Sequence, residues 1–505
     1  MTPGDAPAGG LLLRRLGIDT YQEPVVYLHR DSAICKAEGF EARARIEVWR
    51  GATHILATLN VVYDSLIGIQ QLGLSEAAWR ALGGIDGDVL RVAHARPLQS
   101  LSAVRAKIYG RPLGAEAAAA IVRDVAEGRY SDIELAALIT ACSGDRMDVA
   151  ETIALTRAMV AAGQRLRWDS GTVLDKHCVG GLPGNRTTLL VVPIVAACGL
   201  TIPKTSSRAI TSPAGTADTM ETLAPVALDL PTMRRVVESE GGCIAWGGAV
   251  SLSPADDMLI RVERPLGLDS DGLMVASVLS KKIAAGSTHV VIDMPVGRSA
   301  KVRSAQAARA LAQRFHSVGG ALGIGVSVIA SDGSQPVGRG IGPALEAWDV
   351  LAVLQNLPDA PADLRQRALA LAASLLELGG KAGAGQGRAL AAGVLDSGAA
   401  WTKLQAICAA QGGMREPPRA AHTHVLGALH RGRLTAIDNR RLAQLAKLAG
   451  APRAPAAGLE LHAPLGTLLR PGQPLLTLHA ESPGELAYAL AYAEAQDTIF
   501  TIQQA

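Results

Sequence analysis

The chain has 505 residues, of which 49% are hydrophobic, and carries a formal net charge of +3. This length exceeds what one hydrophobic core supports, so we expect several domains. The near-neutral charge argues against a nucleic-acid-binding protein. The longest apolar run, Leu189–Leu200, contains Pro193 and is too short for a membrane-spanning helix.

Signals for export, disulfides and metals are weak. The N-terminal segment places its charges after a three-residue apolar run, so we expect no signal peptide. The cysteines lack Cys-x-x-Cys spacing, which favours neither a zinc site nor a disulfide framework. They are Cys35, Cys142, Cys178, Cys198, Cys243 and Cys408. We therefore expect a cytoplasmic protein without a metal site.

Residues 1–95 are expected to form a β-rich domain. Ala42–Trp49 and Ile55–Val61 alternate along the chain in the manner of strands. A short helix is expected over Ser75–Leu82, followed by a turn and a strand over Val89–Val92. No catalytic cluster is visible in this region.

Residues 96–170 are expected to form a small helical domain. One helix is predicted over Ala115–Glu127, and a Ser131-x-x-Glu134 capping box predicts the start of a second. Asp148 can cap a third helix that ends before Gly163.

Strands and helices then alternate over residues 171–415, which predicts an α/β domain with a parallel or mixed sheet. We expect part of 254–285 to join the helical domain in space. The predicted strands are 171–174, 243–245, 289–294 and 326–330. The predicted helices lie near 188–198, 231–240, 254–263, 271–285, 299–316 and 342–356.

A Pro-rich linker, Gly412–Ala421, leads to an expected α+β domain over residues 422–505. Its predicted strands are 423–428, 434–437, 459–462, 465–469 and 475–479. Its predicted helices are 438–449 and 483–494.

Two polar loops stand out within the α/β region. The first, DKHCVGGLPGNRTT, follows a short strand-like run and opens into a helix, an arrangement that suits anion binding. The second, PKTSSRAITSPAGTAD, gathers hydroxyls around Lys204 and Arg208, which is typical of a phosphate or sugar cradle. Two such loops joined through one buried element are unusual for ordinary surface turns.

These two motifs together resemble the signature of the thymidine/pyrimidine-nucleoside phosphorylase family. The resemblance is closest to the long branch, which includes AMP phosphorylase and the type 2 thymidine phosphorylases, and it covers the chain from about Arg111 onward. It implies a small helical lobe and a large α/β lobe with the active site between them. It also implies a homodimer or larger homo-oligomer. In the AMP phosphorylase branch an N-terminal extension such as residues 1–95 goes with assembly into larger oligomers, and a passive appendage is the alternative.

The implied activity is phosphorolysis of the N-glycosidic bond of a nucleoside or a nucleoside 5′-monophosphate, as in pyrimidine metabolism and nucleotide salvage. The products would be free base and (deoxy)ribose 1-phosphate or ribose 1,5-bisphosphate. No cofactor is implied, because inorganic phosphate is a co-substrate.

The resemblance also assigns candidate site residues. The positions that match phosphate-binding residues are Lys176, Gly181, Thr188, Ser206 and Thr216. The positions that match the nucleotide-binding strip of AMP phosphorylase are Ser207, Arg208, Ala209, Ile210, Thr211 and Ser212.

Asp269 matches the general acid of the AMP phosphorylase branch, although an Asp at this position also suits a helix N-cap. Ser277 and Lys281 lie one helical turn apart and match base-recognising positions of thymidine phosphorylase. Lys301 matches a further base-contacting position.

The first motif departs from thymidine phosphorylases at Cys178, where they carry a Ser, and at Pro183 and Asn185. The chain also gains Lys204 and Arg186, and the added positive charge beside the hydroxyl-rich loop favours a 5′-monophosphate over its parent nucleoside. Arg208 is the natural partner of the 5′-phosphate or of the attacking phosphate. A plain pyrimidine-nucleoside phosphorylase stays open, because the Ser–Lys pair also fits thymine.

Two other functions stay open. A phosphoribosyltransferase of related fold would need acidic metal-binding clusters, and Asp256-Asp257 is the one adjacent acidic pair near the motifs. A non-catalytic nucleotide-binding module would not need Lys176, Asp269 and Lys301 intact. In every case we expect a small-molecule ligand, without nucleic-acid or membrane partners.

Overall fold

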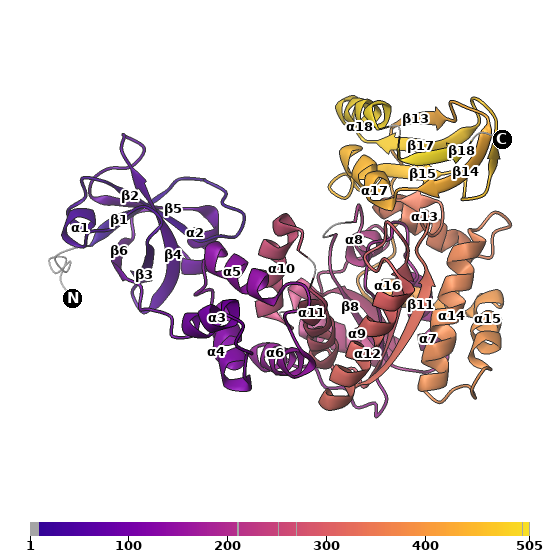
Figure 1. Ribbon diagram of the computed structural model, residues 1–505, viewed down its shortest axis with the longest axis horizontal. Coiled ribbons are helices and arrows are strands. Elements are labelled where there is room, and N and C mark those ends of the chain that lie inside the picture. Colours follow the sequence, from indigo (N-terminus) through magenta and orange to yellow (C-terminus); the bar gives the residue numbers. More distant parts are fainter. Residues whose placement is uncertain (1–9, 210–211, 251, 269, 497, 504–505) are drawn as a thin grey trace. The chain divides into compact units, whose positions relative to one another are not determined.

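The computed structural model describes residues 10–209, 212–250, 252–268, 270–496 and 498–503. It comprises two compact units (Figure 1). Unit 1 contains the residues up to Ala158 together with Ala255–Ser270, and unit 2 contains Met159–Pro254 together with the residues from Asp271 onward. No helix among the described residues is long and apolar enough to cross a membrane.

Unit 1 begins with a closed β-barrel whose strand order is β1-β5-β2-β4-β3-β6. The strands are β1 (Leu11–Arg15), β2 (Val25–His29), β3 (Arg45–Arg50), β4 (Thr53–Val62), β5 (Gln71–Leu74) and β6 (Val89–His94). Alternate apolar side chains, such as Ile46 and Val48, point into the core of this barrel. The expected β-rich extension is therefore confirmed.

Two short helices accompany the barrel, α1 (Ala33–Ala37) and α2 (Glu76–Leu82). Helix α2 begins at Ser75, whose side chain accepts a hydrogen bond from the Ala78 N–H, and ends at Gly83 in the left-handed region.

The helical bundle follows in the same unit. Its helices are α3 (Leu101–Ile108), α4 (Ala115–Ala126), α5 (Asp132–Cys142), α6 (Val149–Ala162) and α10 (Pro254–Leu266). The Ser131–Glu134 capping box is formed in both directions. An ion pair between Arg261 and Asp132 joins α10 to the start of α5. Helix α3 was not predicted from the sequence.

Unit 2 is built on five parallel strands. They are β7 (Leu174–Cys178), β8 (Ile202–Ser206), β9 (Gly242–Trp246), β10 (His289–Val296) and β11 (Gly325–Asp332). One sheet has the order β11-β10-β7 and another pairs β8 with β9, and a parallel bridge from Val173 to Thr201 connects the two. The sequence predicted a parallel or mixed sheet here, and every described pairing among these strands is parallel. All five strands therefore direct their carboxyl ends to one edge.

Helices surround these strands. They are α7 (Thr188–Ala197), α8 (Thr216–Glu221), α9 (Leu230–Glu240), α11 (Asp271–Ala284), α12 (Ala305–Leu322), α13 (Pro343–Leu354), α14 (Ala362–Leu378), α15 (Gly387–Asp396) and α16 (Ala399–Ala410), with a 3₁₀ turn, η1 (Gly247–Ala249). Residues 188–196 of α7 are buried, because its sequence is apolar on all sides. It lies in the largest core, which also takes in side chains of α14, α15 and α16.

Three sequence predictions need correction in this unit. The strand predicted over 171–174 lies at Leu174–Cys178, so Lys176 and His177 belong to a strand and not to the loop. The helix predicted over 299–316 begins at Ala305, because the Ser304 side chain caps it through the Ala307 N–H. Helices α14 to α16 were not predicted.

The C-terminal α+β region has two antiparallel sheets, β12-β15-β17-β13 and β16-β14-β18. The strands are β12 (Gly340–Ile341), β13 (His422–Gly427), β14 (Gly432–Ile437), β15 (Gly458–Leu461), β16 (Leu468–Leu469), β17 (Pro474–Ala480) and β18 (Phe500–Gln503), and the helices are α17 (Asn439–Leu448) and α18 (Pro483–Ala495). Strand β12 precedes α13 and still pairs with β15. This pairing connects the C-terminal region to the α/β region.

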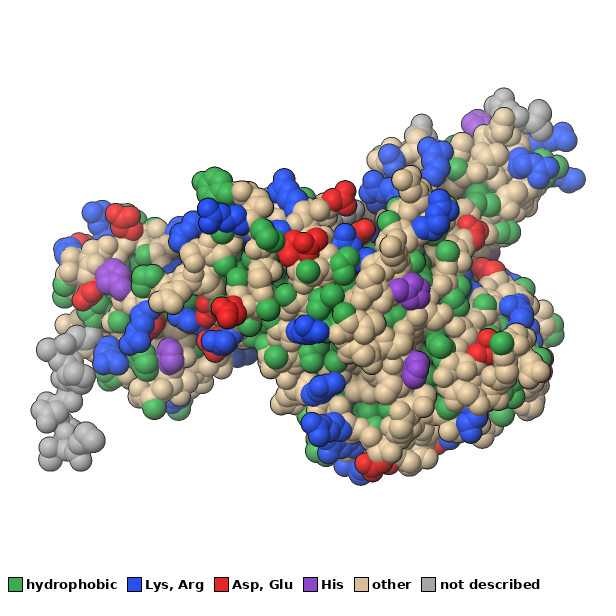
Figure 2. Space-filling model, turned by 60° about the horizontal axis from the view of Figure 1, so that its bottom comes forward, with side chains coloured by type: hydrophobic (Ala, Val, Ile, Leu, Met, Phe, Trp, Pro, Cys, Tyr) green, Lys and Arg blue, Asp and Glu red, His purple; other side chains and the backbone are tan. Residues whose placement is uncertain are grey.

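Charged side chains of both signs are interspersed over the visible face of the molecule (Figure 2). This mixed surface agrees with the formal net charge of +3.

Candidate functional site

The two polar loops follow neighbouring parallel strands at the same edge. Residues 179–187 connect β7 to α7, and the second loop connects β8 to α8. Loops at the carboxyl ends of parallel strands are the usual ligand-binding position in α/β folds. The sequence motifs thus occupy the place where an anion site is expected.

Gly181 brings the first loop against Lys301. Its backbone has a φ of +82°, and a Cβ added there would lie 2.5 Å from the Lys301 backbone nitrogen. Only a glycine fits this close approach without a shift of the backbone. The Lys301 side chain is exposed. Two predicted site residues that are distant in sequence therefore meet.

Lys176 is a buried cation beneath the first loop. It is 1% exposed, and its Nζ donates to Thr187 Oγ1 at 2.7 Å and lies 3.9 Å from Asp293 Oδ2. Burial lowers the pKa of Lys176, while the Asp293 carboxylate raises it in part. A bound anion would stabilise the charged form of this lysine.

Two further buried lysines share one carboxylate. Lys282 Nζ lies 2.8 Å from Asp175 Oδ2, and Lys204 Nζ lies 3.7 Å from Asp175 Oδ1. Burial and then the charge of Lys282 lower the pKa of Lys204 well below its ordinary value, and Asp175 raises it in part. Three buried lysines thus accompany two buried aspartates, Asp175 and Asp293.

The pKa of His177 reflects the same positively charged surroundings. Burial lowers its pKa well below 6.5, and four lysines lower it further. These lysines are Lys282, Lys204, Lys281 and Lys176. This part of the sheet edge favours a neutral imidazole and a negatively charged ligand.

Arg186 joins the first loop to the second. Its Nη1 donates to Thr216 Oγ1 at 3.2 Å and its Nη2 to the Ala214 carbonyl at 3.0 Å. Its Nε contacts the carboxylate of Glu346, which is fully buried on α13. Burial raises the pKa of Glu346 to about 7, although Arg186, the Gly342 N–H and the Thr219 hydroxyl each lower it.

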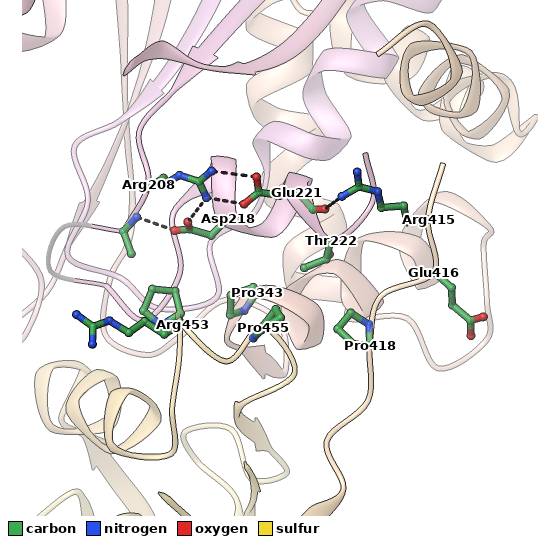
Figure 3. A pocket seen from close by; sticks show the side chains of 12 residues that line it. Arg208, Asp218, Glu221, Thr222, Pro343, Arg415, Glu416, Pro418, Arg453 and Pro455 are labelled. Carbon is green, nitrogen blue, oxygen red and sulfur yellow. Dashed lines mark hydrogen bonds and ion pairs between the residues drawn. The ribbon is translucent and has the colours of Figure 1, made fainter. Parts of the chain in front are cut away.

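Arg208 is held by acidic side chains (Figure 3). It donates to both carboxylate oxygens of Glu221, at 2.5 and 2.9 Å, and to Asp218 at 3.2 Å. Its guanidinium also lies 5.0 Å from the centre of the Trp246 ring. These hydrogen bonds raise the pKa of Arg208 above its ordinary value.

The backbone of the strip is fixed by Asp218. This carboxylate accepts hydrogen bonds from the N–H groups of Ala209, at 2.6 Å, and Gly215, at 2.8 Å. The Ser207 carbonyl accepts from Ala217, and Ser212 Oγ donates to a backbone carbonyl. Ile210 and Thr211 lie outside the described residues, as does Asp269.

Two predicted hydroxyl residues lie where the strands and helices meet the loops. Ser206 ends β8, and its buried hydroxyl has no hydrogen-bond partner among the described residues. Thr188 is the first residue of α7 and is 4% exposed. The Ser206 hydroxyl therefore has hydrogen-bonding capacity that no described protein group uses.

Ser277 and Lys281 form the pair expected from their spacing. Lys281 Nζ donates to Ser277 Oγ at 3.5 Å, one turn apart on α11. Lys281 is also one of the lysines whose charge lowers the pKa of His177.

A cavity of about 620 Å³ lies beside the strip (Figure 3). Arg208 and Glu221 line one side of it, and the segments around Arg415 and Arg453 line another. The basic and acidic side chains on its wall are balanced in number.

Sequence reasoning missed the acidic partners and one lysine of this site. Asp293 and Glu346 belong to neither motif, and Asp175 opens the first motif but was assigned no role. Lys282 stands directly after Lys281 in the chain, and the helical period alone could have shown that one of the two faces inward.

The fold and the site define a two-domain glycosyl transferase. Residues 101–163 match the "Glycosyl transferase family, helical bundle domain", and residues 170–401 match the "Glycosyl transferase family, a/b domain". Among solved structures, anthranilate phosphoribosyltransferase from Thermus thermophilus matches with a TM-score of 0.51 at 22% identity, over 61% of this chain and 99% of that chain. This likeness extends to the fold alone.

Similar proteins span the whole chain. A "Putative thymidine phosphorylase" of Polaromonas sp. is 64% identical over 496 residues, which are 98% of this chain and 97% of that protein. One of Chelativorans sp. is 58% identical over 508 residues and covers 100% of both chains. The chain belongs to this thymidine phosphorylase family of long chains, as the sequence resemblance predicted.

Proposed function

We propose that the protein is a nucleoside phosphorylase, which uses inorganic phosphate to cleave the N-glycosidic bond. The observation that carries this proposal is the positively charged site at the carboxyl-terminal edge of the sheet. There Lys176, the buried hydroxyl of Ser206, which has no described partner, and the hydroxyl of Thr216 lie beside the two loops. The name of the relatives, thymidine phosphorylase, supports the same activity.

In the proposed reaction, a phosphate oxygen bonds to C1′ of the sugar while the bond from C1′ to the base nitrogen breaks. The bonding electrons leave with the base, which takes up a proton. Positive charge develops on the sugar in the transition state, and a phosphate held beside it stabilises that charge. We assign phosphate binding to Lys176, Ser206 and Thr216, and protonation of the base to Asp269.

The remaining predicted residues receive roles on the same basis. Gly181 and Thr188 belong to the phosphate loop, and Ser277, Lys281 and Lys301 are assigned to the base. The strip residues 207–212 are assigned to the sugar. These assignments are proposals that extend the sequence resemblance onto the observed geometry.

The internal ion pairs favour a nucleoside over a 5′-monophosphate. The sequence suggested that added cations would hold a second phosphate, with ribose 1,5-bisphosphate as product. In the structure Arg208 is bound to Glu221, Arg186 to Glu346, and Lys204 lies beside Asp175. Each of these cations already has a carboxylate partner, so the electrostatic reason for a monophosphate is weakened.

The direct test is to incubate the purified protein with thymidine, uridine and other nucleosides in the presence and absence of phosphate. Release of free base together with an equal amount of pentose 1-phosphate, only when phosphate is present, is the expected result. Lys176→Met serves as the inactive comparison. Base release that is independent of phosphate contradicts the proposal, and activity that requires a diphosphate-bearing sugar identifies a phosphoribosyltransferase instead.

A further inference from the structure

The strongest unassigned feature of unit 2 is the buried pair of Arg186 and Glu346. The Arg186 side chain is 9% exposed and the Glu346 side chain is fully buried. A buried ion pair contributes little net stability, because the cost of removing both charges from water offsets their attraction. The position of this pair between two loops suggests a role beyond stability.

The donor nitrogens of Arg186 contact protein atoms that shape the second loop. Three separate nitrogens of its guanidinium contact Thr216, the Ala214 carbonyl and Glu346. The planar guanidinium fixes the directions of these contacts relative to one another. Arg186 therefore determines where the Thr216 hydroxyl lies.

Glu346 connects this arrangement to the C-terminal region. It lies in the first turn of α13, where its Oε1 accepts a hydrogen bond from the Gly342 N–H at 3.3 Å. Gly342 packs so closely on Ala457 that an added Cβ would lie 2.3 Å from the Ala457 carbonyl oxygen, and the Ala344 N–H donates to the Pro455 carbonyl. Contacts with the C-terminal region therefore fix the part of α13 that carries the Glu346 carboxylate.

We propose that Arg186 and Glu346 are a positioning pair that holds the Thr216 hydroxyl for the attacking phosphate. This inference rests on the proposed phosphorylase function and deepens it. Neither residue is assigned a contact with substrate, because the contacts of both are made with protein atoms. The C-terminal region then contributes to phosphate binding through α13, without supplying a residue to the site.

Two single variants test the pair. Glu346→Gln keeps the shape of the side chain and removes its charge, and Arg186→Lys keeps the charge and removes the planar fork. Both are expected to raise the KM for phosphate by about tenfold or more, which is the usual value of one charged hydrogen bond. The KM for the nucleoside is expected to rise less than the KM for phosphate, because the described contacts of Arg186 with the second loop are at Ala214 and Thr216, beyond the strip 207–212.

A double variant separates positioning from folding. Arg186→Met combined with Glu346→Leu replaces the ion pair by apolar groups, a change that proteins often tolerate or that even stabilises them. We expect this variant to fold, with the phosphate KM still raised. Thr219→Val is the matched control, because Thr219 also donates to Glu346, whereas Thr216 is bound by Arg186. It is expected to leave the phosphate KM near the wild-type value.

Thermal unfolding with inorganic phosphate alone provides a readout that does not need activity. Phosphate is expected to raise the Tm of the wild type and of Thr219→Val more than that of the Arg186 and Glu346 variants. Wild-type phosphate KM and Tm shift in the double variant would overturn the positioning role while leaving the phosphorylase function intact. A wild-type protein without phosphorolysis would overturn the proposed function itself.

Discussion

Arg208 binds Glu221 through both of its terminal guanidinium nitrogens, at 2.5 and 2.9 Å. Asp218 adds a third contact at 3.2 Å, and the Trp246 ring lies beneath the guanidinium. A ligand phosphate that approached Arg208 would have to displace a carboxylate that is already well placed. This arrangement sets the substrate preference that we expect.

We predict that nucleosides exceed their own 5′-monophosphates in kcat/KM, measured at equal subsaturating concentrations. Glu221→Ala frees Arg208 and should raise the relative activity on the monophosphate by about tenfold, the value of one charged hydrogen bond. Glu240→Ala, which removes the carboxylate paired with Lys403 on another helix, is the control. A wild-type enzyme that prefers any monophosphate over its parent nucleoside would contradict this prediction.

Ser206→Ala is expected to raise the KM for phosphate while leaving stability almost unchanged. The Ser206 hydroxyl is buried and has no described partner, so its removal breaks no protein hydrogen bond. Thr216→Ala should raise the phosphate KM as well, by roughly ten- to a hundredfold. Ser239→Ala on α9 is the comparison, and steady-state kinetics with phosphate as the varied substrate measure all three. An unchanged phosphate KM in both site variants would place the anion elsewhere.

Asp269→Asn is expected to abolish base release but leave phosphate binding nearly intact. General acid catalysis contributes about 10²- to 10⁴-fold, and the amide cannot donate the proton in the same way. Single-turnover base release measures the chemical step, and the phosphate-induced Tm shift measures binding. If the variant keeps the wild-type kcat from pH 5 to pH 9, Asp269 is a helix cap and not the acid.

The buried Glu346 should make stability depend on pH in a defined direction. Burial raises its pKa from 4.5 to about 7, so the folded state binds a proton more tightly than the unfolded chain. The resulting stabilisation is fully present below about pH 4.5 and is lost as the pH rises through about 7, a change on the order of 3 kcal/mol. Urea unfolding at pH 5 and pH 8 should show this loss in the wild type.

Glu346→Gln has no such proton to bind, so its stability should change less over the same interval. An equal pH dependence in the variant and the wild type would assign the effect to other groups.

Deletion of residues 1–95 should leave a folded protein that forms a smaller assembly. The barrel has its own core, and the α/β region has a separate one. Light scattering compares the assembly mass of the full-length and truncated chains, and circular dichroism checks the fold of the truncated chain. An unchanged mass would remove the assembly role of the barrel.

The sequence predicted elements whose signals are local. Ser131 and Glu134 lie within a few residues of the groups they cap, so their pattern predicted the start of a helix. Ser304 caps α12 in the same local way, but this role was not predicted. Alternation along β3 and β4 marked the barrel strands. Helices α14 to α16 lack such clear local signals in the sequence. Only side-chain packing around the apolar α7 distinguishes their inner faces.

Some residues of the candidate site could not be predicted from local sequence patterns. The motif loops were found because glycines and hydroxyls cluster in the chain. Asp293 and Glu346 were missed because each meets its lysine or arginine across more than a hundred residues. Arg186 was correctly placed in a loop, but its partners, and hence its available charge, depend on the packing of α13.

The closure of the N-terminal barrel limits how that region can contact other molecules. Each of its six strands has a neighbour on both sides within the described residues, so none of them is an edge strand. Association by addition of a strand to an exposed sheet edge, and the edge-to-edge aggregation that such edges permit, are therefore disfavoured. Any partner of the barrel must be recognised through side chains, and its affinity should respond to surface substitutions.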